Sequence, residues 1–132
     1  MVSVGLLVIR LVIGLAFIGH GAQKLFGWFG GYGPKGTGGW MESIGIKPGV
    51  AMAVAAGLME FVGGALFAAG LLTPLGAALI VFAMLGAIVK VHAPNGFWNT
   101  SNGYEFPLTL LVVAVGVALT GPGAISLDAL LF

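Results

Sequence analysis

The sequence contains no cysteine and very few charged residues. Without cysteine the chain cannot form disulfides, thiolate metal sites or a Cys-x-x-Cys redox pair, so any thiol chemistry has to come from a partner. Only 7% of its 132 residues are charged and 59% are hydrophobic, whereas a soluble domain carries about 25% charged residues. The composition indicates a single-domain integral membrane protein. Its net charge of +1 gives no reason to expect nucleic acid as a partner.

Four apolar segments account for most of the chain, at residues 4–26, 50–71, 74–91 and 104–120. A bilayer core needs about 20 helical residues per span, and helices satisfy their own backbone hydrogen bonds in lipid. We therefore predict an all-α fold, a bundle of four transmembrane helices within residues 1–132. Pro48 and Pro74 suit helix starts, and Gly70 suits a helix end.

Two long connections, at about 27–49 and 92–103, alternate with the short hairpin at 70–74. Four spans place both long connections on one side of the membrane. Together with Tyr104, which directly follows the second connection, they account for all the tryptophan and tyrosine of the chain, residues that favour the membrane interface. We predict that the first connection is a glycine- and aromatic-rich loop that covers one end of the bundle.

Charged residues inside the apolar segments are expected to face the bundle and to have partners. Helical spacing gives one stripe per helix. The stripes are Arg10, Gly14, Phe17, Gly21 and Lys24; Ala53, Gly57, Glu60 and Gly64; Leu79, Ala83, Gly86 and Lys90; and Glu105, Thr109, Val112 and Gly116. Measured from the end with the long connections, Glu60 lies roughly 16 Å deep and Arg10 roughly 22 Å deep. We therefore predict an Arg10–Glu60 ion pair, with either a structural or a functional role.

A second polar group gathers where three helices meet the long connections. His20, Gln23 and Lys24 end the first helix, Lys90 and His92 end the third, and Glu105 begins the fourth. Snorkelling to the headgroups would explain each lysine singly, but it would not explain why so many polar residues gather at one end of the bundle. The candidate catalytic residues are His20, Lys24, Glu60 and Glu105, and the candidate ligand-binding residues are Gln23, Lys90, His92, Asn95 and Trp98.

Two other motifs are rejected. Residues 31–36 spell GYGPKG, but a nucleotide loop of this GxGxxG form needs a preceding strand and a βαβ unit. A haem between His20 and His92 is disfavoured, and no metal site is expected, because neither acidic helix residue belongs to a Glu-x-x-His motif.

The chain resembles the DoxX family of small bacterial and archaeal membrane proteins. The matching stretches are RL at 10–11, GHGAQKLFG at 19–27, MEFVGG at 59–64, GLLT at 70–73, NGFW at 95–98, GYE at 103–105, and GPG at 121–123 with LD at 127–128. The resemblance covers nearly the whole chain. It implies a multi-pass, four-helix protein of a prokaryotic cell membrane.

For function, the resemblance implies an oxidoreductase component, since members carry that label through association with quinol oxidase and thiosulfate:quinone oxidoreductase. Such a role needs a diffusible quinone or a redox partner subunit, because no redox motif occurs in this chain. The residues leave a second interpretation open, a non-redox carrier, channel or lipid-binding protein. The small-residue stripes suit packing within one chain or in a homo-oligomer equally.

Overall fold

The computed structural model describes all residues, 1–132, and contains only helices and connecting segments. The helices are α1 (Val2–Leu25), α2 (Gly33–Ser43), α3 (Gly49–Ala69), α4 (Thr73–Ala87), α5 (Glu105–Thr120) and α6 (Leu127–Leu131). A π-helical turn (Ile88–His92) and a 3₁₀ turn (Ala93–Asn95) continue α4, and a 3₁₀ turn (Asn99–Ser101) precedes α5. The predicted all-α membrane fold is confirmed: three helices are long and apolar enough to span a bilayer, and α5 is a shorter apolar helix.

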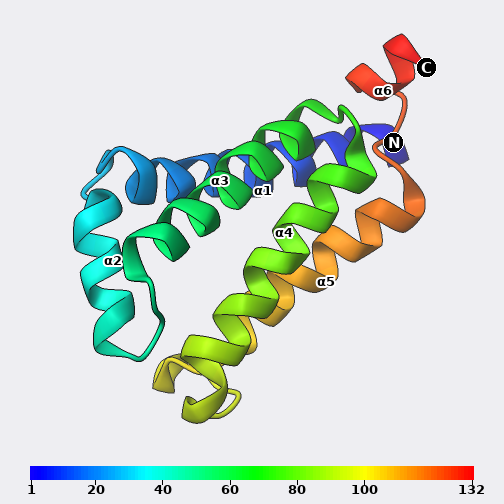
Figure 1. Ribbon diagram of the computed structural model, residues 1–132. Helices are drawn as coiled ribbons and strands as arrows, with labels where there is room; N and C mark the ends of the chain where they lie inside the picture. The colour runs from blue at the N-terminus through cyan, green and yellow to red at the C-terminus, as the bar shows by residue number, and fades with distance from the viewer.

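Glycines set the contact between α1 and α3, which lie side by side in Figure 1. A Cβ on Gly14 would lie 2.7 Å from the Gly64 carbonyl oxygen, and one on Gly21 would lie 2.6 Å from the Phe61 nitrogen. A side chain at either position would force the helices to shift, so the two backbones are in close contact at these glycines. The stripes predicted on these helices are buried as expected, except that Lys24 is half-buried.

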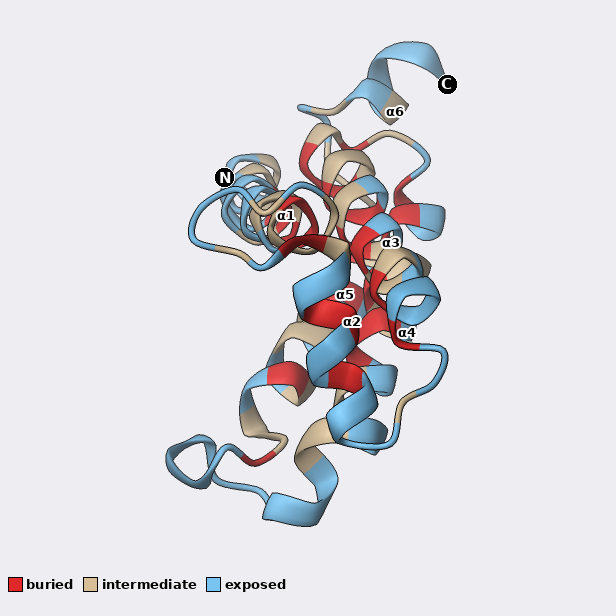
Figure 2. Ribbon diagram, turned by 60° about the vertical axis from the view of Figure 1, so that its left-hand side comes forward, coloured by how far each residue is buried: buried red, intermediate tan, exposed pale blue.

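The second half of the chain forms another helix pair, α4 and α5, inclined to the first (Figure 1). The core between the pairs is a cluster of eight buried apolar residues, which lie on α1, α3, α4 and α5. It includes Phe17, Phe67, Ile80 and Val117. Figure 2 shows the buried residues along the helix contacts and exposed residues on the outer faces, the distribution that suits helices surrounded by lipid.

The stripes predicted for α4 and α5 were less accurate. On α4 only Ala83 of its stripe is buried, and on α5 Thr109, Val112 and Gly116 are exposed. The packing face of α5 contains Ala114 and Val117 instead. The reason is that both stripes were counted from a charged residue at a helix end. There the side chain lies beside the connecting segment, so it does not mark the face on which the helix packs.

The connection between α1 and α3 differs from the predicted loop, because its middle part is the helix α2. Gly33 begins this helix and Pro34 occupies its first turn, a position where the missing N–H of proline costs nothing. Gly38 packs against the backbone of Val50, which leaves no room for a Cβ. The GYGPKG stretch therefore starts a helix that packs against α3.

Candidate functional site

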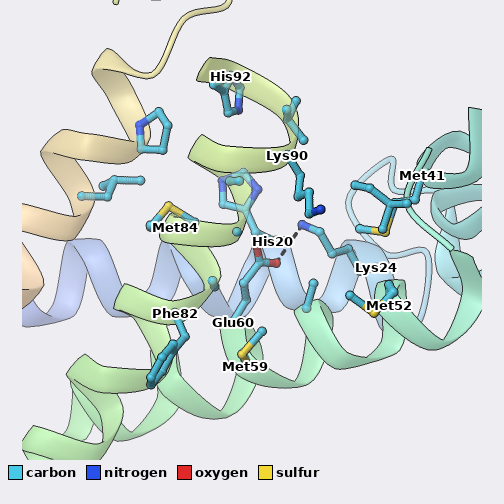
Figure 3. Close-up of a pocket in the computed structure, with 18 of the residues that line it drawn as sticks. His20, Lys24, Met41, Met52, Met59, Glu60, Phe82, Met84, Lys90 and His92 are labelled. Carbon is cyan, nitrogen blue, oxygen red and sulfur yellow. Dashed lines mark hydrogen bonds and ion pairs between the residues drawn. The ribbon is translucent and has the colours of Figure 1, made fainter. Parts of the chain in front are cut away.

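A cavity of about 450 Å³ lies between the two helix pairs, at the end where α2 crosses. Fifteen of its 24 lining residues are hydrophobic. Its charged and imidazole side chains are drawn in Figure 3: His20 and Lys24 from α1, Glu60 from α3, and Lys90 and His92 from the π-helical turn. Volume and lining are typical of a small-molecule site, which is mostly apolar with a few convergent polar groups.

One ion pair stands on the cavity wall. Lys24 Nζ donates a hydrogen bond to Glu60 Oε2 at 2.7 Å, and the Glu60 side chain is only 8% exposed. A buried carboxylate is tolerated when it is paired in this way. The pair is neutral as a unit, and it brings a donor ammonium and an acceptor carboxylate into an otherwise apolar space.

The predicted Arg10–Glu60 ion pair was wrong. The close contacts of Gly14 with Gly64 and of Gly21 with Gly57 fix the register of the antiparallel helices. In this register Arg10 lies beside Gly70, at the far end of α3, and Glu60 lies near Lys24. Depths counted separately along two helices did not include that register.

Arg10 instead binds four backbone carbonyls. Its guanidinium donates to the carbonyl oxygens of Phe67, Ala68, Pro122 and Ile125 at 2.7–3.3 Å, and the residue is 1% exposed. These acceptors belong to the end of α3 and to the segment after α5. Planar Arg, with five N–H donors, can satisfy several acceptors at once. We name this network the Arg10 clamp.

Asp128 fastens the same C-terminal segment to the start of α4. Its carboxylate accepts hydrogen bonds from Leu72 N–H and from Thr73 N–H and Oγ1, at 2.7–2.9 Å. Burial alone raises the pKa of Asp128, but the bonds from Thr73 and Leu72 and the charge of Arg10 outweigh burial and lower the pKa below its usual 3.8. The carboxylate also holds Leu72 at a φ of 46°, a conformation that costs energy for leucine.

The two histidines present their Nε2 atoms as acceptors when neutral. His92 Nδ1 lies 2.9 Å from the Asn102 carbonyl oxygen, which can only accept, so Nδ1 carries the hydrogen. His20 Nδ1 lies 3.2 Å from Gln23 Oε1, while Gln23 Nε2 donates to the Phe29 carbonyl oxygen. Both rings therefore leave a free Nε2 lone pair.

Four of the predicted site residues do not line the cavity. Gln23 orients His20, and Asn95 donates to the carbonyl oxygens of Val91 and Asn102. Glu105 Oε1 accepts from Asn99 N–H, and Trp98 packs against Phe97. These residues shape the connections around the site. Their positions near helix ends in the sequence did not distinguish this task from contact with a ligand.

The sequence interpretation missed the methionines and α2. Met41, Met52, Met59 and Met84 line the cavity, together with Trp40. Met52, Ala56 and Met59 lie at spacings of four and three on α3, which would have indicated a shared helix face. The residues of α2 give no such signal, because its sequence is rich in glycine and lacks a regular apolar spacing.

Comparison with known proteins gives one matching family and several similar membrane proteins. The family model described as DoxX matches residues 5–93. The chain is 32% identical over 130 residues to the Bacillus subtilis protein named "Putative oxidoreductase CatD", covering 98% of this chain and 89% of that protein. It is 34% identical over 136 residues to the Escherichia coli "Inner membrane protein YphA", covering 93% of this chain and 87% of that protein.

A third relative is the Mycobacterium tuberculosis "Uncharacterized membrane protein Rv3486", which is 35% identical over 130 residues, covering 91% of this chain and 77% of that protein. No solved structure matches the chain. The family match, the extent of these relatives and the apolar helices agree with one another. The chain is a multi-pass membrane protein that belongs to the DoxX family.

Proposed function

We propose that the protein is a component of a quinone-linked membrane oxidoreductase and that the cavity binds the quinone headgroup. The observation that carries the proposal is the Lys24–Glu60 pair on the wall of an apolar cavity among lipid-facing helices. The name of the Bacillus subtilis relative supports oxidoreductase chemistry. The quinone itself is our inference from the shape and polarity of the cavity.

The residues present fit such a ring. Phe82 and Phe106 line the cavity and are 64% and 54% exposed, so its apolar rim reaches the surface that faces lipid. A membrane-soluble ring can enter there without crossing water. Methionine side chains adapt to irregular apolar shapes and contact aromatic rings favourably. The cavity volume lies in the range of about 300–1,000 Å³ usual for small-molecule sites.

The polar groups have distinct tasks in this proposal. Lys24 donates a hydrogen bond to a carbonyl oxygen of the ring, and it stabilises negative charge that develops on that oxygen. Glu60 holds the Lys24 ammonium in place and exchanges protons with it. Quinone reduction takes two electrons and two protons. Since the chain has no cysteine, we propose that the electrons come from a partner subunit.

The test uses purified protein in lipid nanodiscs. Extraction and mass spectrometry should find bound quinone, and a short-chain quinone analogue should bind with saturation. The variant Lys24→Met/Glu60→Met removes both charges, so it should stay folded and lose at least tenfold in affinity. Lys35→Met, a lysine that does not line the cavity, is the matched control.

Two results would contradict the proposal. One is a quinone-free preparation that ignores the analogue but binds or transports another solute, which would favour a non-redox carrier. The other is unchanged affinity for the analogue in the double variant when Lys35→Met also leaves it unchanged.

A further inference from the structure

The cavity carries one positive charge that the chain does not neutralise. Lys24 is paired with Glu60, while Lys90 lines the same cavity and makes no ion pair. Figure 3 shows the ends of the Lys24 and Lys90 side chains pointing toward one another. Lys90 is exposed and its ammonium is unpaired, so it can attract an anion that enters the cavity, whereas the Lys24 ammonium is already paired with Glu60.

No other acidic residue of the chain is available for that purpose. Glu42 accepts from Gly49 N–H, Glu105 accepts from Asn99 N–H, and Asp128 lies on the C-terminal segment. None of the three lines the cavity. The titratable groups around Lys90 are therefore His20 and Lys24 from α1, Glu60 from α3 and His92 from its own turn, because the lining residues of α2 and α5 do not titrate.

His92 adds a proton acceptor to this charge. Its Nδ1–H is committed to the Asn102 carbonyl oxygen, which leaves Nε2 with a free lone pair. A ligand that is already an anion needs only the ammonium. A ligand that carries a hydroxyl group can use both, because the imidazole takes its proton and the ammonium holds the resulting oxyanion.

We infer that the cavity recognises a lipophilic ring with an ionisable hydroxyl group and binds it as the oxyanion, with Lys90 as the anion-binding residue and His92 as the proton acceptor. The ligand O–H bond breaks, its proton forms a bond with His92 Nε2, and the electron pair stays on the ligand oxygen next to Lys90. No electrons leave the ligand in this step. The inference rests on the proposed function, and it specifies the hydroxyl-bearing, reduced form of the ring as the species that the site prefers.

The first measurement uses an alkylated 4-nitrophenol, whose absorbance changes when it ionises, with the protein in phosphatidylcholine nanodiscs. Compared with empty nanodiscs, the wild type should lower the pKa of the bound probe by about one unit or more, as a nearby opposite charge does. Lys90→Met should abolish this change, whereas Lys90→Arg and Lys35→Met should retain it. The O-methyl ether of the probe should bind at least tenfold more weakly than the phenol itself.

The second measurement follows protons in weakly buffered solution. In His92→Asn, the amide nitrogen can keep the hydrogen bond to the Asn102 carbonyl, but no basic nitrogen remains. When the protonated probe binds, this variant should release close to one proton per probe to solution, and the wild type should release clearly fewer. A role of His92 in folding alone would not change this ratio.

The outcomes separate the two proposals. The inference is overturned if the wild type binds the probe without lowering its pKa, if Lys90→Met keeps the lowered pKa, or if wild type and His92→Asn release equal numbers of protons. If the short-chain quinone analogue still binds in those cases, the proposed function stands. Protein that binds neither the analogue nor the phenol contradicts both.

Discussion

The Lys24–Glu60 pair allows the carboxylate of Glu60 to be buried between α1 and α3. Glu60 is almost fully buried, and its only charged partner is 2.7 Å away. Taking two charges out of water is costly, and removal of one partner leaves the other uncompensated. If the pair only stabilises the fold, apolar residues could replace both partners without loss of function. If the pair binds a ligand, the same replacement would abolish binding.

A double-mutant cycle on this pair is therefore informative. We expect Lys24→Met to lower the free energy of unfolding by about 3 kcal/mol, because Glu60 is left buried without a partner. In Lys24→Met/Glu60→Met most of that stability should return, while binding of the quinone analogue stays lost. The measurement is denaturant or thermal unfolding in mild detergent, together with the binding assay. A double variant that regains binding would show that the pair is only structural.

Asp128 gives a pH dependence with a defined sign. Its pKa in the folded protein is lower than the usual 3.8, so the unfolded chain binds a proton more readily. The stability that Asp128 contributes is present above the usual value and is lost as the pH falls below it. We expect the melting temperature of the wild type to drop as the pH falls below about 4.

In Asp128→Asn the drop should be smaller, and stability near pH 7 should already be reduced, because the amide nitrogen that replaces one carboxylate oxygen cannot accept a hydrogen bond from Leu72 or Thr73. Glu42→Gln serves as the control, since Glu42 is exposed and binds only the Gly49 N–H. An acid transition that is identical in wild type and Asp128→Asn would refute this role.

At the scale of the helices, the α1–α3 contact depends on glycines with backbone on the opposite side. Gly21 has Phe61 N and Gly57 O within 2.7 Å of where a Cβ would be, while Gly19, two residues earlier, has nothing within 4 Å. The same change at these two positions isolates packing from helix propensity.

We expect Gly21→Ala to destabilise the protein by about 1–3 kcal/mol through overpacking. Gly19→Ala should be neutral or slightly stabilising, because alanine favours the helix. Thermal unfolding of the two variants in the same detergent checks this. Equal melting temperatures would mean that α1 and α3 can separate without cost.

How far the sequence predicted these helices depends on the part of the chain. Hydropathy and length identified the apolar helices, and small-residue spacing identified the buried faces of α1 and α3. Both signals are local. The register between α1 and α3 is not local, so the partner of Glu60 was assigned to Arg10 when it is Lys24. Helix α2 was missed because its six-residue start, GPKGTG, has low helix propensity, and tertiary contacts with α3 stabilise it.

For the site, too, local features were predictable and non-local ones were not. The gathering of His20, Lys24, Lys90 and His92 followed from their shared position at helix ends, and these residues do line one cavity. The π-helical turn was not predictable from composition. It widens the end of α4 just where Lys90 and His92 occur, and such turns are frequent at functional sites.

In the molecule as a whole, the buried polar interactions form two separate groups, one at each end of the helix bundle. The cavity and its ion pair lie at the end covered by α2, and the Arg10 clamp closes the other end. Figure 1 shows α6 and the N-terminus at that same end of the molecule. Ser3 Oγ also accepts a hydrogen bond from Ala124 N–H there. The C-terminal segment thus completes the fold by accepting hydrogen bonds from a buried arginine, at the end away from the cavity.

This division predicts that Arg10 and the C-terminal segment act as a unit. Removal of residues 122–132 takes away two of the four carbonyls of the Arg10 clamp and exposes an unsatisfied guanidinium, so the melting temperature should fall. In an Arg10→Met background the same truncation should cost less, with a coupling of about 1–3 kcal/mol. Under conditions in which the Arg10→Met protein remains folded, its affinity for the quinone analogue should be unchanged, because Arg10 does not line the cavity. Additive effects of the two changes on unfolding would show that Arg10 and the C-terminal segment do not act as a unit. Loss of binding in folded Arg10→Met would show that the two ends of the molecule are not independent.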